Sequence, residues 1–63
     1  MDNKLFDVVA VNMKTNKVRI IAAAKTERNA EAIENMAVQR RGVEEEFFNT
    51  VPNGKFKDGD DYK

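Results

Sequence analysis

The expected fold is built around two apolar runs near the N-terminus, LFDVVAV at residues 5–11 and KVRIIAAA at residues 17–24. Both runs are rich in β-branched residues, which favour strands. The polar residues MKTN at 13–16 separate them and end on Asn16, and asparagine tolerates the positive φ that closes a bulged hairpin loop. The sequence therefore predicts an antiparallel hairpin with a three-residue loop and a bulge.

The register of the hairpin follows from the apolar pattern. In the predicted register, Val18 lies opposite Asn12 and Ile20 lies opposite Ala10. A slip of one residue reverses the face of every side chain in a strand, and it would place Arg19 among apolar residues. One face of the sheet is then expected to carry Phe6, Val8, Ala10, Val18, Ile20 and Ala22. The other face is expected to carry Asp7, Val9, Val11, Lys17, Arg19, Ile21 and Ala23.

The rest of the chain predicts one helix and one further strand. Thr26 suits a helix N-cap, Glu27 suits the first turn, and apolar residues recur at helical spacing from Ala30, so we expect a helix over 27–41. A third strand is expected over 44–51, where Phe47 and Phe48 must point to opposite faces. The turn at 52–54 ends it, and a short edge strand is expected over 55–57.

This order predicts a single α+β domain, ββαβ, over residues 1–57. Its antiparallel sheet has three strands in the order 2-1-3, and the helix packs on one face, with a right-handed connection over the first strand. Residues 58–63 are expected to be an acidic, frayed tail. The predicted core residues are Phe6, Val8, Ala10, Val18, Ile20, Ala22, Ala30, Ile33, Ala37 and either Phe47 or Phe48.

The composition excludes several classes of chemistry. The chain of 63 residues has no Cys, His or Ser, so disulfides, thiolate or imidazole metal sites and acyl-transfer triads are absent. No glycine-rich loop joins a strand to a helix. We therefore expect no enzyme, no cofactor, no metal and no small-molecule substrate. No apolar run reaches the roughly 18 residues of a membrane span, and the first residues do not resemble a secretory signal, so the cytoplasm is the expected location.

The sheet face opposite the helix is the main functional candidate. One helix covers one face, and the other would then expose a contiguous apolar patch, which usually marks an interface. We expect Val9, Val11 and Ile21 to anchor a protein partner, with Lys17 and Arg19 at the rim. A charged residue at Val9 should then abolish binding and leave the fold intact. Self-association of two such faces, or of two strand edges, into a homodimer is the alternative.

The charge distribution offers a third hypothesis. The net charge is zero, but residues 1–42 hold eight basic and five acidic side chains, whereas residues 43–63 hold three basic and six acidic ones. Nucleic-acid binding would use the basic hairpin and the helix end. The residues concerned are Lys14, Lys17, Arg19, Lys25, Arg28, Arg40 and Arg41. The sequence pI of 6.2 disfavours nucleic acid, because phosphate-binding domains are normally basic.

Several segments resemble short uncharacterised proteins encoded by bacteriophages and prophages. The likeness rests on KTERNAEAI at 25–33, RRGV at 40–43, Phe47-Phe48, and the stretch from Pro52 to Asp60. The resemblance implies a setting in the cytoplasm of an infected bacterium and a role as an accessory or host-takeover factor. It implies no site residue.

Overall fold

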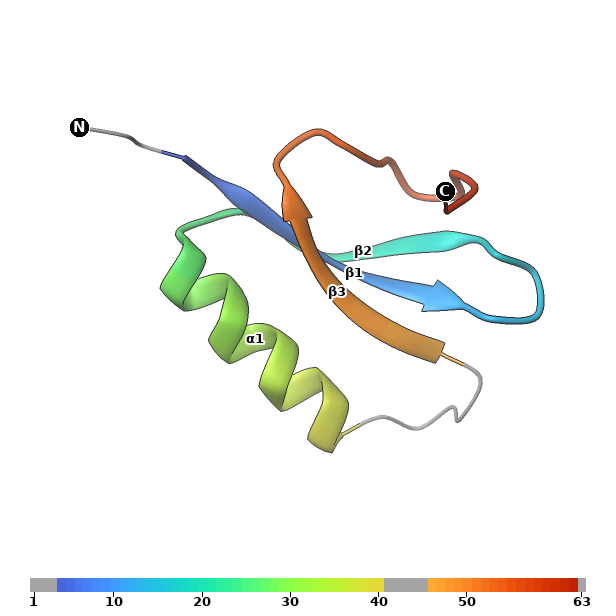
Figure 1. The fold of residues 1–63 in the computed structure, drawn as a ribbon, viewed down its shortest axis with the longest axis horizontal. Coiled ribbons are helices and arrows are strands. Elements are labelled where there is room, and N and C mark those ends of the chain that lie inside the picture. The colour runs from blue at the N-terminus through green and yellow to red at the C-terminus, as the bar shows by residue number, and fades with distance from the viewer. Residues whose placement is uncertain (1–3, 41–45, 63) are drawn as a thin grey trace.

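The computed structural model describes residues 4–40 and 46–62. In chain order, its elements are β1 (Phe6–Asn12), β2 (Val18–Lys25), α1 (Glu27–Gln39) and β3 (Glu46–Pro52). The strands form an antiparallel sheet in the order β2-β1-β3, with α1 along one side of it (Figure 1). The predicted α+β fold and strand order are confirmed.

The ends of α1 follow the local sequence. The Thr26 side chain accepts a hydrogen bond from the backbone N–H of Asn29 at 3.3 Å, as an N-cap should, and Glu27 lies in the first turn. The helix ends at Gln39, two residues before the predicted end, and Arg41 lies outside the described residues. The strand predicted from residue 44 is seen from Glu46, because residues 44 and 45 are also outside the described part.

The predicted hairpin register is wrong by one residue. In the structure Val11 lies opposite Val18, and Val9 lies opposite Ile20. The cause is Asn12. Its Oδ1 accepts hydrogen bonds from the backbone N–H groups of Lys14 and Thr15, at 2.9 and 3.1 Å. This Asx turn lengthens the loop to four residues and closes it on Lys17. The positive φ predicted for Asn16 is confirmed at 62°.

Two irregularities then change the phase of β2. Val8 lies opposite Ala22 although Val9 lies opposite Ile20, so Ile21 is the extra residue of a bulge. The one-residue register change places Val18 and Ile20 on the face of Val9 and Val11, and Ile21 on the other face beside α1, which corrects their predicted sides. The bulge then returns Ala22 to its predicted face, opposite Val8. A second shift lies between Val8 and Phe6, and near it Ala24 has a φ of 57°.

The sheet face opposite α1 is covered, contrary to the sequence-based prediction. Val9 and Val11 are both 0% exposed because the chain after β3 crosses this face. Phe56 and Tyr62 stack on each other with ring centroids 5.3 Å apart, and Tyr62 meets Phe47 edge-on at the same distance. The cluster on this face contains Val9, Val11, Val18, Val51 and Phe56, with Ile20, Phe47 and Tyr62 packed against it.

The last described residues pair with the outer edge of β2 (Figure 1). Val18 donates to the carbonyl oxygen of Asp60 at 2.8 Å and accepts from the N–H of Gly59 at 2.7 Å. The side chain of Asp58 accepts from the N–H of Ile20 at 2.6 Å. Residues 53–62, hereafter the C-terminal segment, therefore form a cover over the sheet. They differ from the predicted edge strand at 55–57 and from the free tail expected from residue 58.

The helix side of the sheet holds a smaller core. Val8, Ala10 and Ala30 are fully buried, as predicted. Phe48 lies opposite Ala10 and is half-buried, while its neighbour Phe47 packs on the opposite face. Both phenylalanines therefore contribute, one to each side. Val51 and Phe56 are buried core residues that the sequence-based list lacked.

Burial of Val9 makes a testable prediction for stability. Val9→Ala should lower the free energy of unfolding by about 2 kcal/mol, because two buried methyl groups are lost and a cavity remains. Val9→Glu should unfold the domain, since it buries a charge without a partner. Urea denaturation followed by circular dichroism measures both. The exposed control Val38→Ala should change stability by less than about 0.5 kcal/mol, and a folded Val9→Glu protein would contradict the covered face.

Candidate functional site

The structure does not bring the predicted partner-binding residues together. Val9 and Val11 are enclosed, and Ile21 lies on the other side of the sheet. Lys17 forms an ion pair with Asp61 at 2.7 Å at the edge of β2, and Arg19 reaches Glu46 at 3.2 Å. The site predicted on an uncovered face is therefore absent from the folded chain, because that face is part of the core.

An exposed apolar groove instead lies between α1 and β2. We call it the apolar strip, and it is lined by Ile21, Ile33, Met36, Ala37 and Arg40 around a hollow of about 210 Å³. Met36 is 50% exposed and Ile21 is 36% exposed. Ile33, Met36 and Arg40 recur at spacings of three and four, so they share one flank of the helix. The register of β2 adds Ile21 to them from the sheet.

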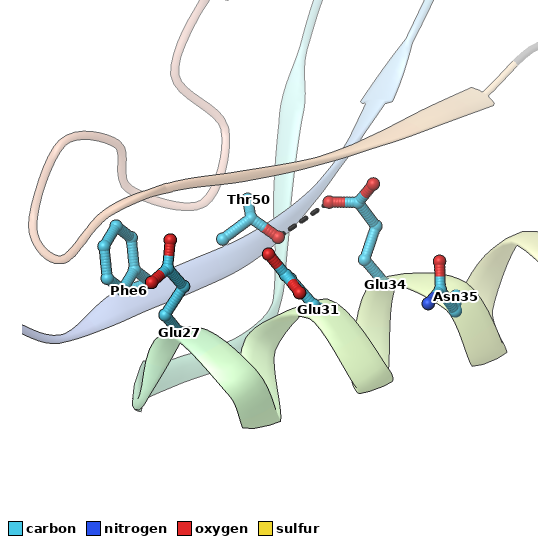
Figure 2. A pocket seen from close by; sticks show the side chains of 6 residues that line it. All are labelled: Phe6, Glu27, Glu31, Glu34, Asn35 and Thr50. Atoms are coloured by element: carbon cyan, nitrogen blue, oxygen red, sulfur yellow. Dashed lines mark hydrogen bonds between the residues drawn. The ribbon is translucent and has the colours of Figure 1, made fainter.

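The opposite flank of α1 has a different chemistry. A hollow of about 450 Å³ lies between the helix and β3, and we call it the acidic hollow. Figure 2 shows the side chains that line it. Glu27, Glu31 and Glu34 project toward it from successive turns of α1, and Thr50 faces them from β3. Phe6 and Asn35 complete the lining. The spacing of the three acids at i, i+4 and i+7 was visible in the sequence and could have indicated this row.

Within the acidic hollow, one hydrogen bond links the helix to the sheet. The Thr50 hydroxyl donates to Glu34 Oε1 at 2.6 Å, as drawn in Figure 2. Across the described ranges 4–40 and 46–62, no group of three His, Cys, Asp or Glu side chains is arranged to hold a metal ion. The lining offers mostly carboxylate oxygens, so the hollow is suited to accept hydrogen bonds from cationic or polar groups.

Asp7 is the one buried charged side chain among the described residues, at 3% exposed. Its Oδ1 accepts hydrogen bonds from the N–H of Ala24 at 2.9 Å and from Nδ2 of Asn53 at 2.7 Å. Its Oδ2 accepts from the N–H of Gly54 at 3.0 Å. The carboxylate therefore joins β1 to the end of β2 and to the turn after β3. Three donors on one enclosed acid indicate a structural anchor.

The same contacts set the pKa of Asp7. Burial raises the pKa because it penalises the charged form. The hydrogen bonds from the Asn53 side chain and from the backbone of Ala24 and Gly54 lower it, and together they outweigh burial. The pKa of Asp7 in the folded chain consequently lies below the ordinary value of 3.8.

Several basic side chains of the nucleic-acid hypothesis have other contacts in the described part of the chain. Lys17 and Arg19 are engaged with Asp61 and Glu46. Lys14 also has an interaction partner, and Arg41 lies outside the described residues. Arg40 lines the apolar strip. Acidic groups of the chain thus engage two of the seven cations of this hypothesis, Lys17 and Arg19.

The anchor at Asp7 predicts a pH dependence of stability. Because its pKa is lower in the folded chain, the stabilisation by Asp7 is complete above pH 3.8 and is lost as the pH falls through the folded value. Asp7→Asn should reduce the unfolding free energy at pH 7 by about 1.5–3 kcal/mol, the value of hydrogen bonds to a charged group. It should also flatten the loss of stability below pH 4. Urea titrations from pH 7 to pH 2 measure both, and parallel curves for the two proteins would contradict the assignment.

Within the described residues, no helix is long and apolar enough to cross a membrane. Comparison of the chain with protein-family models, with curated proteins and with solved structures finds no match to any of them. The interaction surfaces described above therefore stand on their own geometry.

Proposed function

We propose that this chain is a small protein-binding module that docks its partner on the apolar strip between α1 and β2. The observation that carries the proposal is the exposure of Met36 and Ile21 after both faces of the sheet have been covered. Neighbouring exposed apolar side chains beside a hollow are typical of interaction sites. This surface replaces the one centred on Val9 and Val11.

The chemistry of the apolar strip favours one kind of occupant. Among the described residues, its lining combines four apolar residues with Arg40 and includes no acidic residue. We infer that the partner is an amphipathic segment whose apolar side chains fill the hollow and whose Asp or Glu meets Arg40. Methionine is unbranched and polarizable, so Met36 can adapt its shape to such a segment. Arginine can bind a carboxylate through two parallel hydrogen bonds.

The size of the strip favours side chains over a free small molecule. Its hollow of about 210 Å³ is below the roughly 300–1,000 Å³ of typical small-molecule pockets. It can hold one or two apolar side chains of a partner. A contact of this size is expected to be transient, with its affinity concentrated in a few residues.

The resemblance to phage-encoded proteins supports a setting for this module. It points to the cytoplasm of a bacterium, where the chain would act as an accessory or host-takeover factor. The partner would then be a bacterial or phage protein.

Self-association by strand pairing has less support. The described C-terminal segment occupies the outer edge of β2 from Lys17 to Ile20. On β3, the N–H of Thr50 is taken by the Asn49 side chain at 3.0 Å, and Pro52 has no N–H to donate. A second copy could still dock through the apolar strip, so the test below distinguishes it from a foreign partner.

The helix offers a matched pair of variants for the test. Met36 and Val38 are similarly exposed, at 50% and 48%, but only Met36 lines the strip. Proteins captured from a bacterial lysate should bind Met36→Glu at least about tenfold more weakly than wild type, the loss typical of an interface anchor. They should bind Val38→Glu with almost the same affinity as the wild type. Quantitative mass spectrometry of the captured proteins gives the ratios, and circular dichroism verifies the folds.

Two further measurements complete this test. Arg40→Glu should weaken the same partner, and a compensating Lys in the partner's acidic position should restore binding. Sedimentation equilibrium of the pure protein shows whether the chain forms a dimer. A dimer that is lost in Met36→Glu would identify a second copy, and not a foreign protein, as the occupant of the apolar strip. Equal capture by the wild type and Met36→Glu would contradict the proposed surface.

A further inference from the structure

We propose that Asn53-Gly54 is a deamidation site that the carboxylate of Asp7 holds unreactive in the folded chain. Asparagine is among the chemically labile residues, and a following glycine makes it more so because no side chain hinders the attacking backbone nitrogen. The dipeptide lies in the exposed turn after β3. The proposal concerns a covalent modification and does not depend on the docking surface.

The turn holds both residues in a defined geometry. Lys55 donates its N–H to the carbonyl oxygen of Pro52 at 3.1 Å, and Gly54 has a φ of 83°. Together these features describe a type II turn with Asn53 and Gly54 at its centre. An added Cβ at Gly54 would meet nothing within 4 Å, so the positive φ, and not crowding, is what favours glycine there.

The reaction needs only this dipeptide and water. The backbone nitrogen of Gly54 loses its proton and attacks Cγ of Asn53, which closes a five-membered succinimide ring. The bond from Cγ to Nδ2 breaks, and that nitrogen leaves as ammonia after taking up a proton. Water then adds to one of the two ring carbonyls and opens the ring. The product at position 53 is aspartate or isoaspartate.

Asp7 binds both groups that react. Its Oδ2 accepts from the N–H of Gly54 at 3.0 Å, and its Oδ1 accepts from Nδ2 of Asn53 at 2.7 Å. While these bonds persist, the attacking nitrogen keeps its proton, and the leaving amide cannot rotate freely. The negative charge of the carboxylate also disfavours an amide anion next to it. Deamidation should therefore wait for this contact to open.

The product would weaken the anchor that protected it. A carboxylate at position 53 would face Asp7 where the amide now donates a hydrogen bond, and two like charges at that distance repel. The isoaspartate form also adds a methylene to the backbone just before Phe56, the buried residue of the C-terminal segment. Deamidation would thus loosen the cover over Val9 and Val11 in a slow and irreversible step.

A second turn in the same chain serves as an internal control. Asp58-Gly59 has a similar turn. Gly59 has a φ of 88°, and its N–H donates a hydrogen bond to the carbonyl oxygen of Val18 at 2.7 Å. Asp58 has no amide, so it releases no ammonia. Peptides from residues 52–55 and 57–60 can therefore be compared within one sample.

The test measures the loss of Asn53 by peptide mapping of the full chain at pH 7.4. We expect the folded wild type to react more than about tenfold more slowly than the same chain unfolded in urea, because the reaction requires local opening. Asp7→Asn should react severalfold faster than wild type. Ala30→Gly, which weakens α1 far from the turn along the chain, is the control and should react at the wild-type rate once its unfolded fraction is subtracted.

Three results would overturn the proposal. Folded and unfolded wild type could react equally fast, Asp7→Asn could react at the wild-type rate, or it could react more slowly, which would make the carboxylate a base and not a shield. If Asp7→Asn fails to fold, hydrogen exchange of the Gly54 amide in the wild type takes its place. Slow exchange supports the shield, and exchange at the rate of an open loop rejects it.

The consequence for stability has its own test. Asn53→Asp mimics one product of deamidation, and its melting temperature should be lower than that of the wild type. The double variant Asp7→Asn/Asn53→Asp exchanges the amide and the carboxylate, so it should recover part of the loss through a restored hydrogen bond. Simple addition of the two single effects would show that positions 7 and 53 are not coupled and would reject the proposed loosening.

Discussion

The carboxylate of Asp7 joins three parts of the chain that local sequence does not connect. It accepts hydrogen bonds from the N–H of Ala24 near the end of β2, and from the Asn53 side-chain amide and the Gly54 N–H in the turn after β3. This turn starts the C-terminal segment on its path across the sheet. Hydrogen bonds keep the acid charged although it is buried, so these three segments are joined through an ionised group that only the folded chain satisfies.

The C-terminal segment solves the problem of a small sheet with one helix. β1 is apolar on both sides, and α1 covers only one of them (Figure 1). In a chain of 63 residues an uncovered row of valines would remove much of the driving force for folding. Phe56 and Tyr62 close that row, while Asp58 and Gly59 bind the edge of β2. The acidic end of the chain thus has a structural role.

The same covering explains why the interaction surface moved. The sequence indicated correctly that apolar residues exceed what one helix can bury, but it placed the excess on Val9 and Val11. The C-terminal segment buries these, and the one-residue register change of β2 carries the side chain of Ile21 to the other side, beside Met36. The acidic row on α1 could be read from its spacing, whereas its pairing with Thr50 needed β3 in place.

The identity of the elements and their order along the chain follow from local sequence patterns. The N-cap at Thr26 and the positive φ of Asn16 are as predicted, because capping and turn chemistry act over a few neighbouring residues. The strand order is as predicted because the most apolar strand, β1, takes the central place in the sheet. The register, the face of Ile21 and the path of residues 53–62 follow instead from contacts made in the folded chain. A strand pairing alternates with a period of two, so one extra loop residue closed by Asn12 reverses every later side chain, and a bulge reverses it again. Those choices depend on hydrogen bonds between residues distant in sequence, and no local pattern encodes them.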